Sequence, residues 1–182
     1  GTLAYGLGDW CEAGTVGEDH YRTPVGLTDT LVGMDICAKA ARVLAAAGRE
    51  KGAAYAAVLR EELRKAFRAA YVRGGALFCD TQTAYAMALA YGGTDEDERA
   101  GAVARLKELI AADGGHFRVG VLGGRVLFDV LAEAGEAEIA FRLIVQKSFP
   151  SYGYMLEHGA TTLWEAFYEI EEGADCLLYT SD

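Results

Sequence analysis

The sequence has few of the residues that mark several common protein classes. Only 2 of its 182 residues are Pro and 52% are hydrophobic, which excludes a disordered chain. No apolar run reaches the roughly 18 residues of a membrane-spanning helix, so we expect no membrane contact. The cysteines include no CxxC pair and stand far apart, at Cys11, Cys37, Cys79 and Cys176. This spacing is typical of free thiols in a reducing compartment, or of cysteines without a role, and predicts neither a disulfide framework nor a zinc site.

Basic residues are also scarce. The chain has 17 Lys and Arg against 27 Asp and Glu, a formal net charge of −10. Because nucleic-acid binding needs a concentrated basic face, we expect no nucleic-acid partner. The sequence contains neither a GxxxxGK[ST] phosphate loop nor a GxSxG nucleophile elbow. Glu18-Asp19-His20 lacks partners at ligand spacing and is predicted to be a solvated loop. We therefore predict no metal site and no cofactor.

The two ends of the chain differ from ordinary protein termini. The sequence opens Gly1-Thr2-Leu3, with no Met and no charged leader. Its last seven residues read like a translated transposase adapter of the kind used in sequencing libraries. We therefore expect residues 1–175 to belong to one domain and residues 176–182 to be a non-native tail. An ordinary C-terminal tail is the alternative.

Helical patterns fill most of the chain. Thr23-Pro24 predicts a helix start with Thr23 as N-cap, and Gly48 predicts its end. Apolar residues lie between them at spacings of three and four, the period of one helix face. Similar patterns predict a second helix from residue 49 to Gly74-Gly75 and a third over 80–91. A fourth is predicted to be capped by Thr94-Asp95-Glu96-Asp97, whose acidic residues suit the positive end of the helix dipole.

Shorter helices are predicted over 125–134, 137–147 and 163–168, and residues 116–122 are predicted to be a loop. This makes about seven helices joined mostly by short turns that contain Gly. The predicted fold class is all-α, built from helical hairpins.

One segment, residues 152–165, combines aromatic rings, hydroxyls and a carboxylate. Thr162 and Glu165 have the spacing of a capping box, in which Glu165 would only start a helix. In the alternative interpretation, the helix dipole keeps Glu165 ionised as a general base. Tyr152 and Trp164 are of the types that line sugar-binding clefts.

A second segment, Gly8-Asp9-Trp10, presents an acid and an indole in a turn rich in Gly. Asp9 would accept hydrogen bonds from sugar hydroxyls and Trp10 would stack on a sugar face; alternatively, Trp10 anchors the core. His116 is either a substrate-facing loop residue or a surface histidine.

Several motifs occur in a fixed order along the chain: Gly8-Asp9-Trp10, Thr23-Pro24, Asp80-Thr81-Gln82-Thr83-Ala84, Gly115-His116-Phe117, Gly120-Val121-Leu122-Gly123, Leu131-Ala132-Glu133-Ala134-Gly135, Phe149-Pro150-Ser151-Tyr152-Gly153-Tyr154-Met155 and Gly159-Ala160-Thr161-Thr162-Leu163-Trp164-Glu165. This ordered set resembles the bacterial α-L-rhamnosidases of glycoside hydrolase family 78. Two positions differ from the family pattern. Tyr152 stands where Trp is usual, and Ala166-Phe167-Tyr168-Glu169 stands where Arg-Trp-Asp-Gly is usual.

The resemblance implies a six-hairpin (α/α)6 toroid that removes terminal non-reducing α-L-rhamnose from rhamnosides with inversion. It implies that Glu165 is the general base and that the general acid lies upstream of Gly8-Asp9-Trp10, beyond this chain. Twelve helices need at least roughly 180–220 residues, so about seven helices form an incomplete toroid. We expect the chain alone to be inactive.

Two other function classes remain open from the sequence. One is another (α/α)6-toroid enzyme of different sugar specificity, such as a different exo-glycosidase or a glucuronyl hydrolase. The other is a non-catalytic helical remnant that binds carbohydrate.

Overall fold

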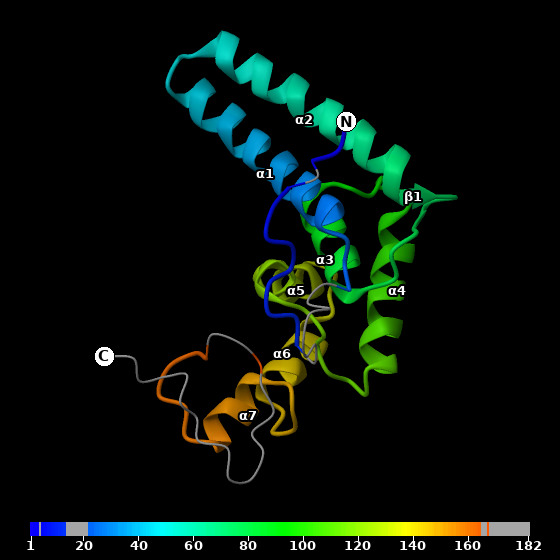
Figure 1. The fold of residues 1–182 in the computed structure, drawn as a ribbon, viewed down its shortest axis with the longest axis vertical. Helices are drawn as coiled ribbons and strands as arrows, with labels where there is room; N and C mark the ends of the chain where they lie inside the picture. The colour runs from blue at the N-terminus through cyan, green and yellow to red at the C-terminus, as the bar shows by residue number, and fades with distance from the viewer. Residues whose placement is uncertain (4, 14–21, 165–166, 168–182) are drawn as a thin grey trace.

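A computed structural model gives the fold and describes residues 1–3, 5–13, 22–164 and 167. Seven α-helices occupy this part of the chain (Figure 1): α1 (Val25–Ala46), α2 (Glu50–Tyr71), α3 (Gln82–Tyr91), α4 (Arg99–Ala112), α5 (Val121–Glu133), α6 (Ala137–Val145) and α7 (Tyr152–Glu157). Two short antiparallel strands, β1 (Val72–Arg73) and β2 (Ala76–Leu77), lie between α2 and α3. The all-α class predicted from the sequence is confirmed.

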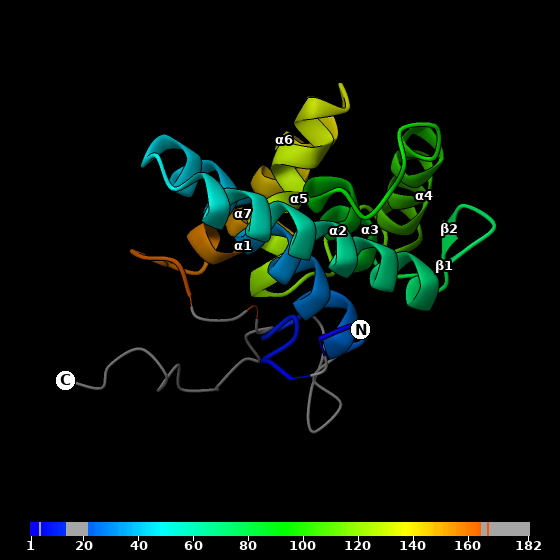
Figure 2. The same cartoon turned by 90° about the horizontal axis from the view of Figure 1, so that it is seen from above.

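The helices form two layers. α1 packs on α2, α3 on α4 and α5 on α6, while α3 also contacts both α1 and α5 (Figures 1 and 2). α3 is the most enclosed of the seven, with every residue from Gln82 to Leu89 buried, whereas α4 buries three of its 14. α1, α3 and α5 therefore form an inner layer covered by their even-numbered partners. Alternating inner and outer helices make up part of an (α/α)6 toroid.

Small side chains allow α3 to sit at the centre. Ala84, Ala86 and Ala88 are fully buried, and their short side chains let neighbouring helices approach closely. Larger side chains from the surrounding helices complete the core, among them Leu31 of α1 and Leu127 of α5. The core therefore lies around α3.

The segments that precede the inner helices meet at one end of the molecule. The hydroxyls of Thr23, before α1, and Thr81, before α3, are 2.7 Å apart. Gln82 donates from Nε2 to the carbonyl of His116 at 3.0 Å, in the segment before α5. Gln146, in the segment before α7, donates to the carbonyl of Gly115 at 3.1 Å. This end, where α1, α3, α5 and α7 begin, is called here the N-terminal end of the inner layer.

Two of the predicted helix caps are wrong. α1 begins one residue beyond Pro24 without a side-chain cap, because the Thr23 hydroxyl is paired with that of Thr81. α4 begins at Arg99, five residues after the predicted cap at Thr94, and no side chain caps it either. Asp95 is instead paired with arginines of α2, so that the acidic residues bind a neighbouring helix.

Three helical segments also differ from the prediction. α5 begins four residues earlier than the pattern indicated and includes residues 121 and 122 of the predicted loop. α7 was not predicted; the Ser151 side chain caps it by accepting from the amide of Tyr154 at 2.8 Å. Leu163 and Trp164, the first two residues of the helix predicted over 163–168, are not helical, and most of its remainder lies outside the described residues.

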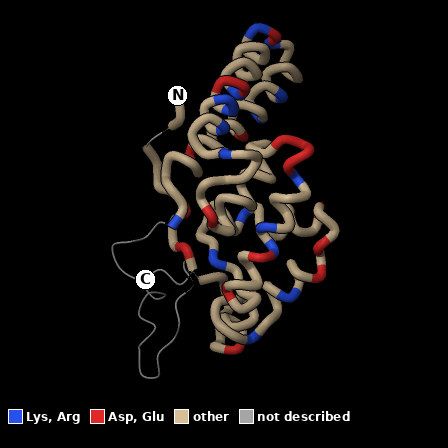
Figure 3. Tube along the Cα trace, turned by 90° about the vertical axis from the view of Figure 1, so that its right-hand side faces the viewer, with Lys and Arg blue, Asp and Glu red and all other residues tan. Residues whose placement is uncertain are grey.

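Charged residues of both signs are interspersed along the described trace (Figure 3). In this part of the chain no region is basic alone, which accords with the net charge of −10. None of the described helices combines the length and apolar character needed to cross a membrane.

An ion-pair network joins α2 to the segment before α4. Arg68 donates two hydrogen bonds of 2.7 Å to the two carboxylate oxygens of Glu98 and also contacts Asp95 at 2.7 Å. The amide of Asp95 donates to Glu98 at 2.8 Å. The hydrogen bonds from Arg68 hold the pKa of Glu98 at about 2, below its usual 4.5. Because the guanidinium of Arg68 donates two hydrogen bonds to one carboxylate, this contact is stronger than an ordinary surface ion pair.

We expect Glu98→Gln to lower the free energy of unfolding by about 1 kcal/mol at pH 7. Because folding lowers the pKa of Glu98, its contribution is present above about pH 4.5 and is lost as the pH falls toward 2. Urea unfolding between pH 3 and pH 7 measures both effects. Glu108→Gln, in an exposed pair with Arg105, is the control and should change little. Equal effects of the two substitutions would contradict the prediction.

Candidate functional site

Four aromatic rings cluster beside the N-terminal end of the inner layer. Phe117 is their centre and is 1% exposed. Its ring centroid lies 4.7 Å from that of Phe167, 5.9 Å from Tyr152 and 6.1 Å from Phe128. Phe117 and Phe167 meet edge to face, the arrangement that ring quadrupoles favour. Residues 117, 128, 152 and 167 come from four separate segments, so the cluster joins Phe167 and the start of α7 to α5.

A pocket of about 290 Å³ opens against this aromatic cluster. Part of its lining consists of the aromatic rings with Leu163 and Trp164, called here the first wall, and the rest consists of Cys11 and residues at the start of α5, called here the second wall. The residues of the second wall are small or apolar: Cys11, Val119, Gly120, Val121 and Gly124, with Arg125 beside them. Aromatic faces and few polar groups are typical of small-molecule sites. This aromatic pocket is the candidate functional site.

Tyr152, predicted to contact a sugar, lines this pocket. Its ring lies 6.1 Å from Phe128 and 5.3 Å from Phe167 between centroids. Burial raises the pKa of the Tyr152 phenol, so the group stays protonated over a wider pH range. Two of the three aromatic residues in the predicted segment 152–165, Tyr152 and Trp164, therefore line the pocket, and Tyr154 does not.

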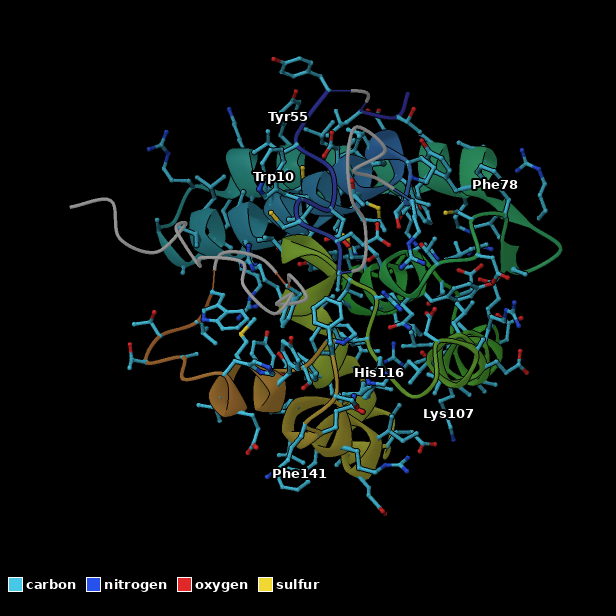
Figure 4. The ribbon with its side chains drawn as sticks, turned by 60° about the horizontal axis from the view of Figure 1, so that its bottom comes forward. Trp10, Tyr55, Phe78, Lys107, His116 and Phe141 are labelled. Atoms are coloured by element: carbon cyan, nitrogen blue, oxygen red, sulfur yellow. The ribbon has the colours of Figure 1, made fainter. Side chains whose placement is uncertain are left out.

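Trp10 lies beside the second wall of the aromatic pocket. Its carbonyl accepts a hydrogen bond of 2.8 Å from the amide of Val121, and its side chain is 44% exposed (Figure 4). Two alternatives were open for this residue, a core anchor or an apolar plate for a sugar. The exposed fraction leaves part of the indole accessible to a ligand.

Asp9 is placed differently from its neighbour Trp10. Its side chain is fully buried, and its two oxygens accept hydrogen bonds from three amides at the start of α5 and from the hydroxyl of Thr83. It is not among the residues that line the pocket. Sugar contact by Asp9 stays a prediction.

His116 lies away from Trp10 (Figure 4). Its Nε2 is 2.8 Å from the hydroxyl of Ser148, so it joins the segments before α5 and α7. It is not among the residues lining the aromatic pocket, and its contact with substrate stays a prediction.

Glu165, the predicted general base, lies outside the described residues. The residue before it, Trp164, lines the aromatic pocket, and its ring centroid lies 6.4 Å from that of Tyr154. Glu18, Asp19 and His20 also lie outside the described residues. Among the residues that the structure does place, no group of three or more His, Cys, Asp or Glu is arranged to hold a metal ion.

Sequence reasoning missed one buried carboxylate at this end. The Glu12 side chain is fully buried and accepts a hydrogen bond of 2.7 Å from Nε of Arg22, whose amide also donates to it at 3.1 Å. Burial raises the pKa of Glu12, and the charge of Arg22 opposes this rise. No sequence pattern links these two residues, because they stand ten positions apart in the chain.

We expect Phe117→Ala to lower the free energy of unfolding by about 3–5 kcal/mol, because it removes the ring at the centre of the aromatic cluster. Phe141→Ala is the matched control, since the Phe141 side chain on α6 is 63% exposed (Figure 4). It should cost less than about 1 kcal/mol. Chemical denaturation of both variants tests the difference, and a loss at position 117 no larger than at 141 would disprove the central role of Phe117.

Comparison with known proteins identifies relatives over almost the whole chain. Residues 1–176 match the family model for the bacterial alpha-L-rhamnosidase six-hairpin glycosidase domain. An alpha-L-rhamnosidase of Streptomyces avermitilis is 35% identical over 169 residues, which is 92% of this chain and 16% of that protein. An alpha-L-rhamnosidase of Formosa agariphila is 36% identical over 132 residues, which is 71% of this chain and 14% of that protein. The chain thus spans less than a fifth of either relative.

Solved structures agree with the sequence relatives. The Streptomyces avermitilis alpha-L-rhamnosidase, crystallised with L-rhamnose, superposes with a TM-score of 0.81 at 35% identity, over 90% of this chain and 15% of the other. The alpha-L-rhamnosidase of Dictyoglumus thermophilum gives 0.82 at 30% identity, over 91% and 19%. The family match, the sequence identities and the shared fold together show that this chain belongs to the bacterial alpha-L-rhamnosidase six-hairpin glycosidase domain family.

Proposed function

We propose that the complete protein carrying this chain hydrolyses terminal non-reducing α-L-rhamnose from rhamnosides, with inversion at the anomeric carbon. The observation that carries the proposal is the aromatic pocket, in a chain of this family: its lining includes Trp164, directly before Glu165, and Phe167, two residues after it. The related Streptomyces structure was determined in complex with L-rhamnose, which supports a sugar as the ligand class.

In the proposed mechanism, Glu165 removes a proton from a water molecule. The water attacks the anomeric carbon on the face opposite the leaving oxygen, and a second carboxylic acid protonates that oxygen as the bond breaks. Inversion requires about 6.5–9.5 Å between the two carboxyl groups, so that the water fits between the sugar and the base. We propose that the acid is supplied by a part of the complete protein beyond these 182 residues.

The aromatic pocket would hold the sugar. Its apolar rings suit the carbon face of a sugar ring, and the accessible part of Trp10 would add a stacking surface at its edge. The Tyr152 hydroxyl would serve as a hydrogen-bond donor, because burial keeps the phenol protonated. These roles depend on aromatic residues that the structure brings to one end of the inner layer.

A substrate panel tests the proposal on the protein expressed from its complete gene. Release of L-rhamnose from an aryl α-L-rhamnoside, with little hydrolysis of the matching glucoside, mannoside or glucuronide, is the expected result. Preference for another sugar would favour a different enzyme on the same toroid. Binding of L-rhamnose without turnover would indicate a carbohydrate-binding protein. Proton nuclear magnetic resonance of the first product anomer decides between inversion and retention.

In the complete protein, Glu165→Gln should lower kcat by about 10²–10⁴-fold, the usual contribution of one positioned base. The amide keeps the size of the side chain, so the melting temperature should stay near that of the wild type. Glu157→Gln is the control, because Glu157 is exposed at the end of α7 and pairs with Lys147. A loss below tenfold with folding intact would mean that Glu165 only caps a helix.

The 182 residues expressed alone should hydrolyse no rhamnoside, because they would carry the base without the acid. The same aryl rhamnoside assay measures this, with the complete protein as the positive control. Turnover by the isolated chain would show that both carboxyl groups lie within it and would overturn the placement of the acid.

A further inference from the structure

Asp9 connects three parts of the inner layer. Its Oδ2 accepts from the Gly120 amide at 2.7 Å and from the Thr83 hydroxyl of α3. Its Oδ1 accepts from the amides of Leu122 at 2.8 Å and Gly123 at 2.9 Å. The carboxylate therefore has four hydrogen-bond donors and is fully buried. The segment before α1, the first turn of α3 and the start of α5 share this one group.

The start of α5 needs such a partner from elsewhere. The first amides of a helix have no acceptor within the helix, and the N-cap residue of α5 is Gly120, which has no side chain to offer one. Asp9 supplies the acceptor from more than 110 residues away, and its negative charge suits the positive end of the helix dipole.

Backbone contacts fix the same junction. The Val121 amide donates to the Trp10 carbonyl at 2.8 Å, and the Ala13 amide donates to the Val119 carbonyl at 3.1 Å. A Cβ at Gly120 would overlap the carbonyl oxygens of residues 9 and 10, so the two segments meet at van der Waals distance. Residues 9–13 and 119–123 therefore form one unit.

This unit supplies four of the residues in the second wall of the aromatic pocket. Cys11, Val119, Gly120 and Val121 face the pocket, whereas Asp9 and Thr83 lie behind them with no exposed surface. A group so placed acts on a ligand only through the wall it holds.

We propose that Asp9 is a positioning residue for the proposed reaction. Its carboxylate, which accepts the hydrogen bond from Thr83, fixes the position of the second wall of the pocket at the start of α5. The inference rests on the proposed function for its ligand and differs from direct sugar binding by Asp9. Thr83 separates the two, because it is fully buried and touches Asp9 without reaching the pocket.

The test compares Thr83→Val, which removes the hydroxyl, with Thr83→Ser, which keeps it, in the complete protein. Thr28→Val is the matched control, since Thr28 is equally buried but donates to Val25 in α1. Two readouts are taken: kcat/KM on an aryl α-L-rhamnoside and amide hydrogen exchange in the peptide covering residues 119–124.

A misplacement of 1 Å in such a site costs about 10²-fold. Thr83→Val should lower kcat/KM less, about tenfold, because three of the four hydrogen-bond donors to Asp9 remain. It should also speed amide exchange at residues 119–124 at least about threefold. Thr83→Ser and Thr28→Val should leave both readouts within twofold. Asp9→Asn should reduce kcat/KM further, and adding Thr83→Val to it should cost little more, because both act through one contact.

Two results would overturn the inference. If Thr83→Val speeds exchange but leaves kcat/KM unchanged, the wall does not govern the reaction. If Asp9→Asn lowers kcat/KM while Thr83→Val changes neither readout, Asp9 acts directly on the sugar. A failure of the proposed function gives a different result. Wild-type protein that hydrolyses no rhamnoside disproves the activity, whereas the amide exchange data still report whether Asp9 and Thr83 hold the wall.

Discussion

The structure depends on how the amides at the N-terminal ends of the inner helices find acceptors. Helices α1, α3, α5 and α7 begin at one end, and each presents amide groups that the helix cannot satisfy. Thr81 caps α3 and Ser151 caps α7 from adjacent positions in the sequence. Asp9 caps α5 from across the fold. Because this last cap is distant, it also joins the segment before α1 to the inner layer and closes one side of the pocket.

Helical periodicity predicted the fold class and most helix bodies, because the apolar spacing of each helix is local information. The boundaries were less predictable where a distant partner decides them. Pairing with Thr81 removes Thr23 as a cap of α1, and Arg64 and Arg68 bind Asp95 away from the start of α4. α5 starts earlier than its own pattern indicates because Asp9 satisfies its first turn. In each case the boundary depends on a hydrogen bond or ion pair with a residue from another segment, which the local sequence does not show.

The sequence predicted the candidate site only where the residue type itself indicates a role. Tyr152 and Trp164 of segment 152–165 line the aromatic pocket. The contribution of Phe117 was not visible, since one buried Phe in a loop rich in Gly has no distinguishing pattern. The ion pair of Glu12 with Arg22 was not visible either, because the two residues stand ten positions apart with no motif that links them. The aromatic contacts of Phe117 arise only when the segments around α5 and α7 converge.

A buried carboxylate is costly to desolvate unless hydrogen bonds replace its water. At Asp9 four donors do so, three of them amides that would otherwise lack acceptors themselves. The amides thus compensate the desolvation cost of the carboxylate, and the carboxylate supplies the acceptors that the first amides of α5 lack. This explains why a charged residue occurs inside the wall of an apolar pocket. The same residue type would suit a sugar ligand, and the sequence alone could not separate these roles. The burial of Asp9 supports the positioning role that we propose, because direct contact with a sugar hydroxyl needs an oxygen that the pocket exposes.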